Sequence, residues 1–400
     1  MAVEAVILDL DGTLIAPVGG TWEPVPGVLT MLDDFRKAGV GIAVATTHDT
    51  AFGKMQQAGI VADVVLTRRL VGAVKGNQAW VDRACTALGV RPHQLVWLGD
   101  SPLDMRSALN ADVIYFNAGW STPDYQYGIT LNTPELFTQV ICEVFRKTVD
   151  WFWSYTGTDA AGRRVLVRAI VDGNGGGDAL LARKLRDLLK EGNDSLVGPI
   201  SLGDFSRFHL LASMYSDRLI GVPGVVWVTY PGSKGAPNAI LNTFALLASM
   251  LFRDRFIPDL LDRHTPATDM SEARVSGVPV DFLDQVNTVR LNPAHRNRIL
   301  DKRVVVVDDF TTEGYSFECA RNLLLLAGAA EVVCVCVGRY GFSDTCSNYA
   351  PVPNYSWDPF QPTQHRLDDF RRKLGSGTTD RNALAVFKAS YEQMLDYVPF

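Results

Sequence analysis

Two pairs of carboxylates, each directly after an apolar run, are the residues best suited to chemistry in this 400-residue sequence. The first pair, Asp9 and Asp11, follows the run at 5–8 and precedes Gly12. Residues i and i+2 of a strand point the same way, so both carboxylates should emerge together at its carboxyl end. One carboxylate could then attack a phosphorus atom while the other moves protons, and both could lie beside a Mg²⁺ ion.

Further polar residues mark the ends of later predicted strands in the first third of the chain. Thr46 ends the second strand, Lys75 precedes a helix, and Asp100 ends another strand four positions before Asp104. In this order the set resembles the motifs of the haloacid-dehalogenase-like phosphatases, and the resemblance covers about residues 4–120.

The resemblance implies a role for each of these residues. Asp9 would be the nucleophile that forms an aspartyl-phosphate, and Asp11 would be the general acid and base. Thr46 and Lys75 would hold the phosphoryl oxygens. The Mg²⁺ ion would be held by four carboxylates, those of Asp9, Asp11, Asp100 and Asp104.

The spacing of these motifs also bears on access to the site. The intervals 13–40 and 47–74 are too short to hold a large cap domain. The resemblance therefore implies an open site, which suits a bulky substrate or closure by another domain. The tail of the chain could cover this site or complete a hood over a second site in the other half.

The second pair of carboxylates, Asp308 and Asp309, follows four consecutive valines and precedes a loop that opens a helix. Two neighbouring carboxylates can bind two vicinal hydroxyls, and backbone N–H groups at a helix N-terminus can cradle a phosphate. A ribose 5-phosphate needs both groups side by side. The candidate binding residues of the loop are Thr311, Thr312, Gly314, Tyr315 and Ser316.

This second motif resembles the donor-binding signature of type I phosphoribosyltransferases, and residues 167–189 and 224–248 resemble segments of their competence-protein-F-like branch. The resemblance implies that Asp308 and Asp309 bind the ribose hydroxyls of phosphoribosyl pyrophosphate (PRPP) and that the loop binds its 5-phosphate. Glu313 departs from the family pattern, because a carboxylate repels a phosphate unless it turns outward or pairs with a cation.

Weaker matches to the same family lie upstream in this half. The pyrophosphate loop would be formed by Ser233, Lys234 and Gly235. The stretch 264–300 lies where these enzymes carry a mobile loop over the site, and its candidate cations are Arg274, Arg290, Arg296 and Arg298.

Short β-rich runs alternate with helix-length segments in both halves of the chain, which predicts an α/β protein with parallel sheets. We expect two doubly wound parallel-sheet domains, a haloacid-dehalogenase-like Rossmannoid and then a type I phosphoribosyltransferase-like domain. The expected divisions are a capless phosphatase domain over 1–135, a helix and linker over 136–163 with the helix ending at Gly157, a phosphoribosyltransferase-like domain over 164–341, and an extended segment with a helical tail over 342–400.

Composition narrows the class of protein. The chain is 47% hydrophobic and 20% charged, as in a globular protein, and its formal net charge is −6. Residues 1–150 hold 16 acidic against 11 basic side chains, which disfavours nucleic acid as a partner. No apolar run is long enough to span a bilayer, no signal peptide is visible, and the six cysteines lack paired spacing. We expect a cytoplasmic protein with small-molecule ligands, and a homodimer stays open.

The leading hypothesis is a bifunctional, Mg²⁺-dependent enzyme of nucleotide or nucleoside metabolism. Its C-terminal half would transfer phosphoribosyl groups between PRPP and a base, and its N-terminal half would remove the 5-phosphate of the nucleotide. An alternative makes the second half a nucleotide-sensing module of a stress or defence system, with the phosphatase as effector. A third hypothesis is a phosphatase that acts on nucleic-acid ends.

Overall fold

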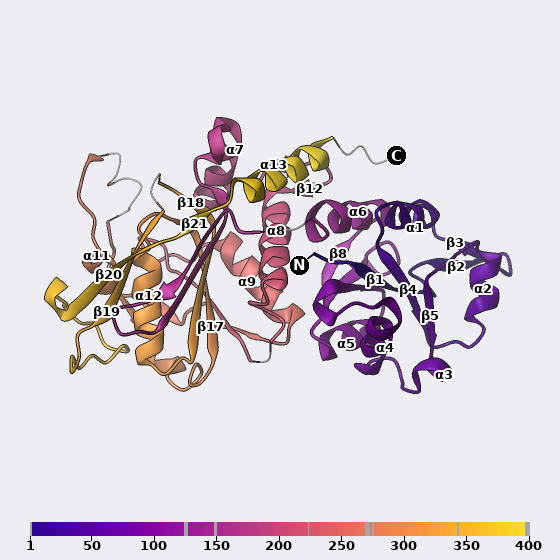
Figure 1. Ribbon diagram of the computed structural model, residues 1–400, viewed down its shortest axis with the longest axis horizontal. Coiled ribbons are helices and arrows are strands. Elements are labelled where there is room, and N and C mark those ends of the chain that lie inside the picture. The colour runs from indigo at the N-terminus through magenta and orange to yellow at the C-terminus, as the bar shows by residue number, and fades with distance from the viewer. Residues whose placement is uncertain are drawn as a thin grey trace.

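The computed structural model describes residues 2–396, except 124–126, 148–149, 223, 269–272, 274–275 and 342–343. Two α/β units lie side by side along the long axis of the molecule (Figure 1). Among the described residues, no helix is long and apolar enough to cross a membrane.

The first unit is built on a six-stranded sheet in the order β5-β4-β1-β6-β7-β8, with every neighbouring pair parallel. Both faces of such a sheet are buried, which explains the nearly unbroken apolar runs of its central strands. The strands are β1 (Ala5–Asp9), β4 (Gly41–Thr46), β5 (Val64–Thr67), β6 (Leu95–Gly99), β7 (Ile114–Ala118) and β8 (Ile129–Leu131).

Helices and one hairpin complete this unit. Helix α1 buries Val28, Met31, Leu32 and Phe35, which recur at helical spacing, against the sheet. The hairpin directly follows the first carboxylate pair and consists of β2 (Ile15–Val18) and β3 (Thr21–Pro24). The helices are α1 (Val28–Lys37), α2 (Ala51–Gln57), α3 (Arg68–Val71), α4 (Ala79–Leu88), η1 (Pro92–Gln94), α5 (Pro102–Asn110) and α6 (Pro134–Gln139).

The second unit holds a seven-stranded sheet in the order β14-β13-β17-β18-β10-β9-β21. Five strands run parallel, and β9 pairs antiparallel with both β10 and β21. These strands are β9 (Trp153–Thr158), β10 (Arg164–Asp172), β13 (Val226–Thr229), β14 (Arg255–Phe256), β17 (Arg303–Thr311), β18 (Glu331–Arg339) and β21 (Thr378–Thr379).

Helices cover both faces of the second sheet. In β17, Val305 and Val307 pack into the core that α8 and α9 share, whereas Val304 and Val306 pack with α12 on the other face. The helices are α7 (Ala179–Arg186), η4 (Asp187–Glu191), α8 (Leu202–Ser216), α9 (Ala239–Leu251), α11 (Leu283–Val286), α12 (Tyr315–Leu326) and α13 (Arg381–Leu395), with η3 (Gly175–Gly177), η5 (Pro293–His295) and η6 (Leu367–Asp369) as short turns. Small two-stranded sheets pair β11 (Leu196–Val197) with β12 (Ile200–Ser201), β15 (Leu261–Arg263) with β16 (Val289–Leu291), and β19 (Thr345–Pro351) with β20 (Phe370–Ser376).

The connection between the units differs from the single helix expected over 136–157. Helix α6 passes into the π-helical turn η2 (Val140–Phe145), and the chain then enters β9. In β9, Trp153 and Tyr155 alternate with more exposed residues, the pattern of a strand with one buried face. The second sheet therefore extends beyond the expected range 164–341 at both ends, because β9 and β21 join its edge.

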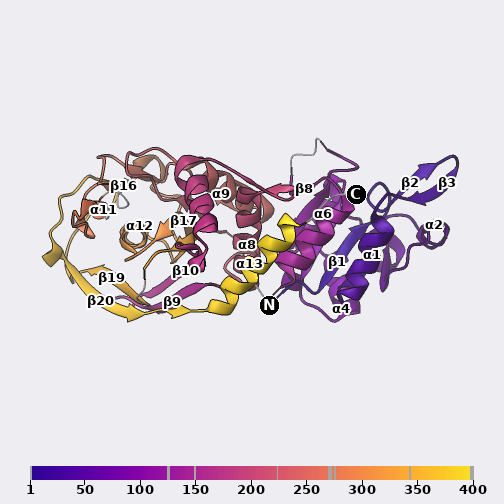
Figure 2. The ribbon, with the colours of Figure 1, turned by 90° about the horizontal axis from the view of Figure 1, so that it is seen from above.

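The two units meet through the amino-terminal edge of the first sheet. The Tyr215 hydroxyl of α8 contacts the carbonyl oxygens of Pro92, at 2.9 Å, and of Leu95, the first residue of β6, at 3.2 Å. One hydrophobic cluster continues from the first unit into the second. Helix α13 lies along both units (Figure 2), and its Ser390 hydroxyl donates to the Glu143 carbonyl at 2.6 Å.

Candidate functional site

The first site lies at the carboxyl ends of β1, β4 and β6. Asp9 ends β1, and its carboxylate contacts the ammonium group of Lys75. The same ammonium lies 2.6 Å from Asp104 and 3.3 Å from the Ala45 carbonyl. Asp9, Asp100 and Asp104 each offer an oxygen within 4.8 Å of the others. The structure thus gathers three of the predicted carboxylates, Asp9, Asp100 and Asp104, around Lys75.

Local sequence explains how the acids come so close. Gly12 has φ +90°, and a Cβ at this position would lie 2.2 Å from an Asp100 oxygen, so any side chain would displace that carboxylate. Ser101 caps α5 and accepts a hydrogen bond from the Asp104 amide at 3.3 Å. The Trp97 indole donates to Asp104 at 3.2 Å, which fixes a fully buried carboxylate.

The charges of this cluster do not balance within the protein. Burial and the neighbouring Asp104 raise the pKa of Asp9 well above its usual range, although Lys75 opposes this shift. Burial also raises the pKa of Asp100, against a hydrogen bond from the Ser121 hydroxyl at 2.8 Å. Three carboxylates share one ammonium, and hard carboxylate oxygens are the ligands that Mg²⁺ prefers. The donor set therefore fits a divalent cation held by Asp9, Asp100 and Asp104.

Asp11 stands apart from this three-carboxylate cluster, although the sequence placed it among the metal ligands. One of its oxygens accepts a hydrogen bond from Thr46 Oγ1 at 3.2 Å, and the other contacts the Lys54 ammonium. Lys54 Nζ also lies 3.9 Å from the ring centre of Trp22 in the hairpin. The sequence did not indicate Lys54 or Trp22 as site residues, because neither lies at a predicted strand end or in a recognisable motif.

The first site is not covered by the second unit. The interunit contacts involve Pro92 and Leu95 at the amino end of β6, whereas Asp100 follows its carboxyl end. Among the described residues, the contacts between the units therefore favour the open site over the alternative of closure by another domain or the tail. The reason is that α8 and α13 pack against the opposite edge of the first sheet.

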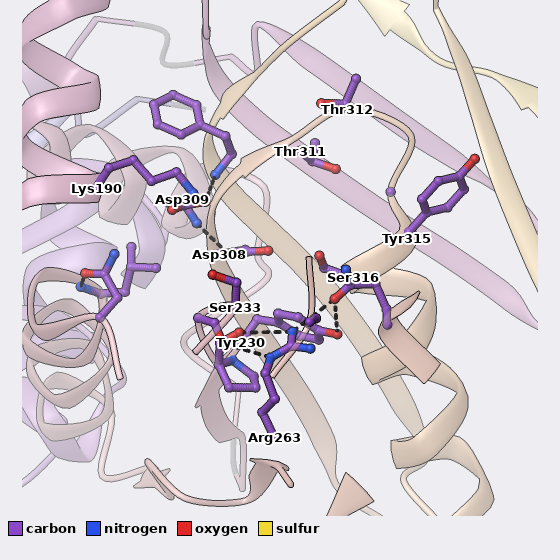
Figure 3. Close-up of a pocket in the computed structure, with 18 of the residues that line it drawn as sticks. Lys190, Tyr230, Ser233, Arg263, Asp308, Asp309, Thr311, Thr312, Tyr315 and Ser316 are labelled. Carbon is purple, nitrogen blue, oxygen red and sulfur yellow. Dashed lines mark hydrogen bonds and ion pairs between the residues drawn. The ribbon is translucent and has the colours of Figure 1, made fainter. Parts of the chain in front are cut away.

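The second carboxylate pair lies in a cavity at the carboxyl end of β17, shown in Figure 3. Lys190, from the π-helical turn η4, reaches into this cavity and its ammonium lies 2.5 Å from Asp309. Burial and the adjacent Asp309 raise the pKa of Asp308 well above its usual range. The amide of Asp309 donates to Asp308 at 2.9 Å.

The predicted phosphate loop forms another wall of the same cavity. Gly314 has φ +83° and caps α12, which lets the loop turn into the helix. Glu313 is absent from the residues that line the cavity, so this departure from the family pattern does not place a carboxylate in it. The loop residues in the lining are those predicted: Thr311, Thr312, Gly314, Tyr315 and Ser316.

Of the predicted pyrophosphate loop, only Ser233 lines this cavity, while Lys234 and Gly235 do not. The cation on this side is Arg263, which ends β15. Its guanidinium donates to the Gly232 carbonyl at 2.8 Å and to the Gln285 side chain at 3.0 Å (Figure 3). These hydrogen bonds fix the Arg263 guanidinium beside the loop that contains Ser233, in the lining of the cavity.

The arginines proposed from the sequence lie elsewhere. Arg290 pairs with Asp262 at 2.9 Å, and Arg296 pairs with Asp358 at 3.5 Å. Arg298 does not line the cavity, and Arg274 lies outside the described residues. Lys190 and Arg263 were missed because both cations reach the cavity through tertiary packing.

The match to a known family falls within the first unit. Residues 20–118 match the model of the haloacid dehalogenase-like hydrolase family. A solved HAD-superfamily hydrolase from Ehrlichia chaffeensis is 14% identical over 35% of this chain and 97% of its own, with a TM-score of 0.31. CbbY from Rhodobacter sphaeroides, solved in complex with phosphate, is 17% identical over 33% of this chain and 95% of its own, with a TM-score of 0.30. The search of curated proteins found no match.

The matched range includes Thr46, Lys75, Asp100 and Asp104, and Asp9 and Asp11 lie just before it. It does not reach the second unit. The N-terminal region of the chain is thus a haloacid dehalogenase-like hydrolase domain.

Proposed function

We propose that the N-terminal domain hydrolyses phosphomonoesters through an aspartyl-phosphate on Asp9. The observation that carries this proposal is the Asp9 carboxylate at a strand end, in contact with Lys75 and within reach of Asp100 and Asp104. A carboxylate nucleophile needs a nearby cation to bring an anionic substrate against it, and Lys75 is placed to do this.

The reaction needs two displacements at phosphorus. In the first, an Asp9 oxygen bonds to phosphorus, the ester P–O bond breaks, and the departing oxygen takes a proton from the Asp11 carboxyl. In the second, Asp11 takes a proton from water, the water oxygen bonds to phosphorus, and the bond to Asp9 breaks. Phosphate leaves, and both side chains return to their starting states.

The remaining residues would bind and neutralise charge. Lys75 and the Thr46 hydroxyl would hold phosphoryl oxygens. A Mg²⁺ ion held by Asp9, Asp100 and Asp104 would supply positive charge opposite the phosphoryl group. The open edge of the site leaves room for leaving groups of many shapes.

A direct test is capture of the covalent intermediate. The protein is incubated with Mg²⁺ and para-nitrophenyl phosphate, quenched with borohydride, and digested for mass spectrometry. Reduction of an acyl phosphate at position 9 converts that aspartate to homoserine. Wild type should show this change at residue 9, and Asp9→Asn should show neither the change nor phosphate release. Phosphate release without any modification of Asp9 would contradict the mechanism.

For the second unit, we propose binding of PRPP and transfer of its phosphoribosyl group to a nitrogenous base. The support is one cavity that joins a carboxylate pair, a helix-capping loop with hydroxyl side chains, and the cations Lys190 and Arg263. Asp308 and Asp309 would bind the ribose hydroxyls, and the loop that precedes α12 would bind the 5-phosphate.

In this transfer the C1–O bond to diphosphate breaks with its electron pair on the diphosphate. The base nitrogen bonds to C1 and loses its proton, or the reverse reaction runs. Ser233, Lys190 and Arg263 would contact the diphosphate, and Mg²⁺ would accompany it as a diphosphate complex. The nucleotide formed would then be a phosphomonoester substrate for the N-terminal domain.

Incubation with PRPP, Mg²⁺ and a panel of bases, followed by mass spectrometry, tests the transfer. Wild type should yield a nucleoside, and Asp9→Asn should instead accumulate the nucleotide. The double variant Asp308→Asn, Asp309→Asn should yield neither product. Calorimetry on the same proteins separates the alternatives, because tight PRPP binding without turnover favours the sensing module.

A further inference from the structure

The fixed position of Asp11 is the feature that the proposed mechanism leaves unexplained. Both of its carboxylate oxygens have partners, the Lys54 ammonium on one and Thr46 Oγ1, at 3.2 Å, on the other. Its side chain is 27% exposed, so solvent alone would leave it free to turn. Thr46 comes from β4 and Lys54 from α2, and the two contacts therefore hold the carboxylate from separate elements.

Lys54 is itself held by the hairpin that follows Asp11. Its side chain is 13% exposed, and its ammonium lies 3.9 Å from the Trp22 ring centre. Such a contact strengthens as the cation loses water. The backbone amide of Trp22 donates to the Gln57 side chain of α2 at 3.1 Å. Trp22, Lys54 and Gln57 thus join the hairpin to α2 at two points, and we call them the Lys54 clamp.

We propose that the Lys54 clamp positions Asp11 for proton transfer to the leaving group, a role that rests on the proposed phosphatase function. Lys54 is a positioning residue, because it acts through Asp11. A proton donor must be held within hydrogen-bond reach of the departing oxygen, and misplacement by about 1 Å can cost ~10²-fold in rate. The clamp holds the carboxylate oxygen of Asp11 that Thr46 does not contact.

The proposal predicts an effect that depends on the leaving group. A para-nitrophenolate ion departs without a proton, so its release depends little on the placement of Asp11. The alkoxide of ribose 5-phosphate is a poor leaving group and needs the proton as the P–O bond breaks. Loss of the clamp should therefore slow hydrolysis of the alkyl ester much more than hydrolysis of the aryl ester.

The experiment compares kcat/KM for para-nitrophenyl phosphate and ribose 5-phosphate in a series of variants. Lys54→Met should lose about 10²-fold on ribose 5-phosphate, the lower range of general acid catalysis, and only a few-fold on the aryl ester. Trp22→Leu and Gln57→Leu should show the same preference with smaller losses, because Lys54 keeps its contact with Asp11. Lys54→Arg should recover part of the activity on the alkyl ester.

The matched control is Lys37→Met, which removes a lysine whose ammonium pairs with Asp33 at 2.7 Å on the exposed face of α1. It should leave both rates unchanged. Thermal unfolding of each variant checks that the domain remains folded. If Lys54→Met lost kcat/KM equally on the two esters, or lost none on ribose 5-phosphate, the proposed positioning role of the Lys54 clamp would be overturned. A wild-type protein that hydrolyses neither ester would overturn the phosphatase function itself.

Discussion

The two candidate sites, for both of which we propose phosphate-bearing ligands, differ in their balance of charge. The first combines the cluster of Asp9, Asp100 and Asp104 with the neighbouring Asp11, and among the described residues the ammonium groups of Lys54 and Lys75 pair with these acids. The second pairs Asp308 and Asp309 with Lys190 and Arg263 in one cavity. Formally, the first site has two negative charges in excess, and the second is neutral.

This difference in charge predicts whether each site needs a metal cation before its phosphate ligand can bind. A site with excess carboxylates repels a phosphate until a cation binds, so the first site should take up Mg²⁺ on its own. A neutral cavity has no comparable need, and the second site should gain its metal together with a diphosphate. The following predictions test this contrast and the independence of the two sites.

The largest expected effect is that of Asp9→Asn on phosphatase activity. Removal of a nucleophile from such a constellation costs on the order of 10⁴- to 10⁶-fold in kcat. Phosphate release measured against wild type gives the loss, and calorimetry with PRPP gives the state of the second cavity. The affinity of the second cavity should be unchanged. A parallel loss of PRPP binding would show that the two sites are not independent.

The second prediction contrasts the buried lysine of the first site with the half-exposed lysine of the second. Lys75→Met leaves three carboxylates without an ammonium and should lower the free energy of unfolding by about 3–5 kcal/mol. Added Mg²⁺ should restore part of this loss. Lys190→Met removes a half-exposed partner and should cost about 0–1 kcal/mol.

Denaturant titrations of both variants, with and without Mg²⁺, measure these differences. Equal losses in the two variants would contradict the charge contrast between the sites.

A smaller effect concerns His209 of α8, the helix whose Tyr215 contacts the first unit. His209 of α8 is buried between Phe205 and Phe387 of α13, and burial lowers its pKa to about 3 from 6.5. The unfolded chain therefore binds the proton first as pH falls. The contribution of His209 is complete above about pH 6.5 and declines as pH falls toward 3.

Unfolding followed against pH should show this loss, and His209→Phe, which keeps the aromatic packing, should flatten that part of the profile. If His209→Phe retained the wild-type profile between these pH values, the titration of other groups would have to account for the acid sensitivity.

The smallest expected effect is at the contact between the units. Tyr215→Phe removes a hydroxyl that contacts the carbonyls of Pro92 and Leu95. The loss should be about 0.5–1.5 kcal/mol of unfolding free energy, the net contribution of one hydrogen bond, because the Pro92 carbonyl still accepts from the Leu95 amide. Differential scanning calorimetry should still show both units unfolding together. Two separated transitions in this variant would mean that the shared core alone does not couple them.

Most residues that the sequence proposed for the first site lie at strand ends, where a parallel sheet brings them to one edge. Asp9, Thr46 and Asp100 needed only this rule, whereas Lys75, which precedes a helix, came from the family resemblance. It also located Asp308 and the loop before α12. It missed Lys54, Lys190 and Arg263, because their positions depend on how a helix or a small sheet packs against the main one.

The fold was predictable to a similar extent. The alternation of apolar runs and helices indicated the central strands of both sheets, including β1, β6 and β17. The pairing of β9 with β21 joins residues about 220 positions apart in the chain, and no local pattern reports such contacts. For the same reason the sequence left open which edge of the first sheet faces the second unit.

The attachment of the units through the amino edge of the first sheet has a consequence for the timing of a two-step reaction. β17 begins with Arg303, which donates to the Leu219 carbonyl beside this contact, and Asp308 lies farther along the strand. Both sites therefore lie at strand ends away from the contact between the units. A nucleotide passed between them would mix with the bulk solvent, so the delay before the final product appears would lengthen on dilution, and any competing enzyme could intercept it.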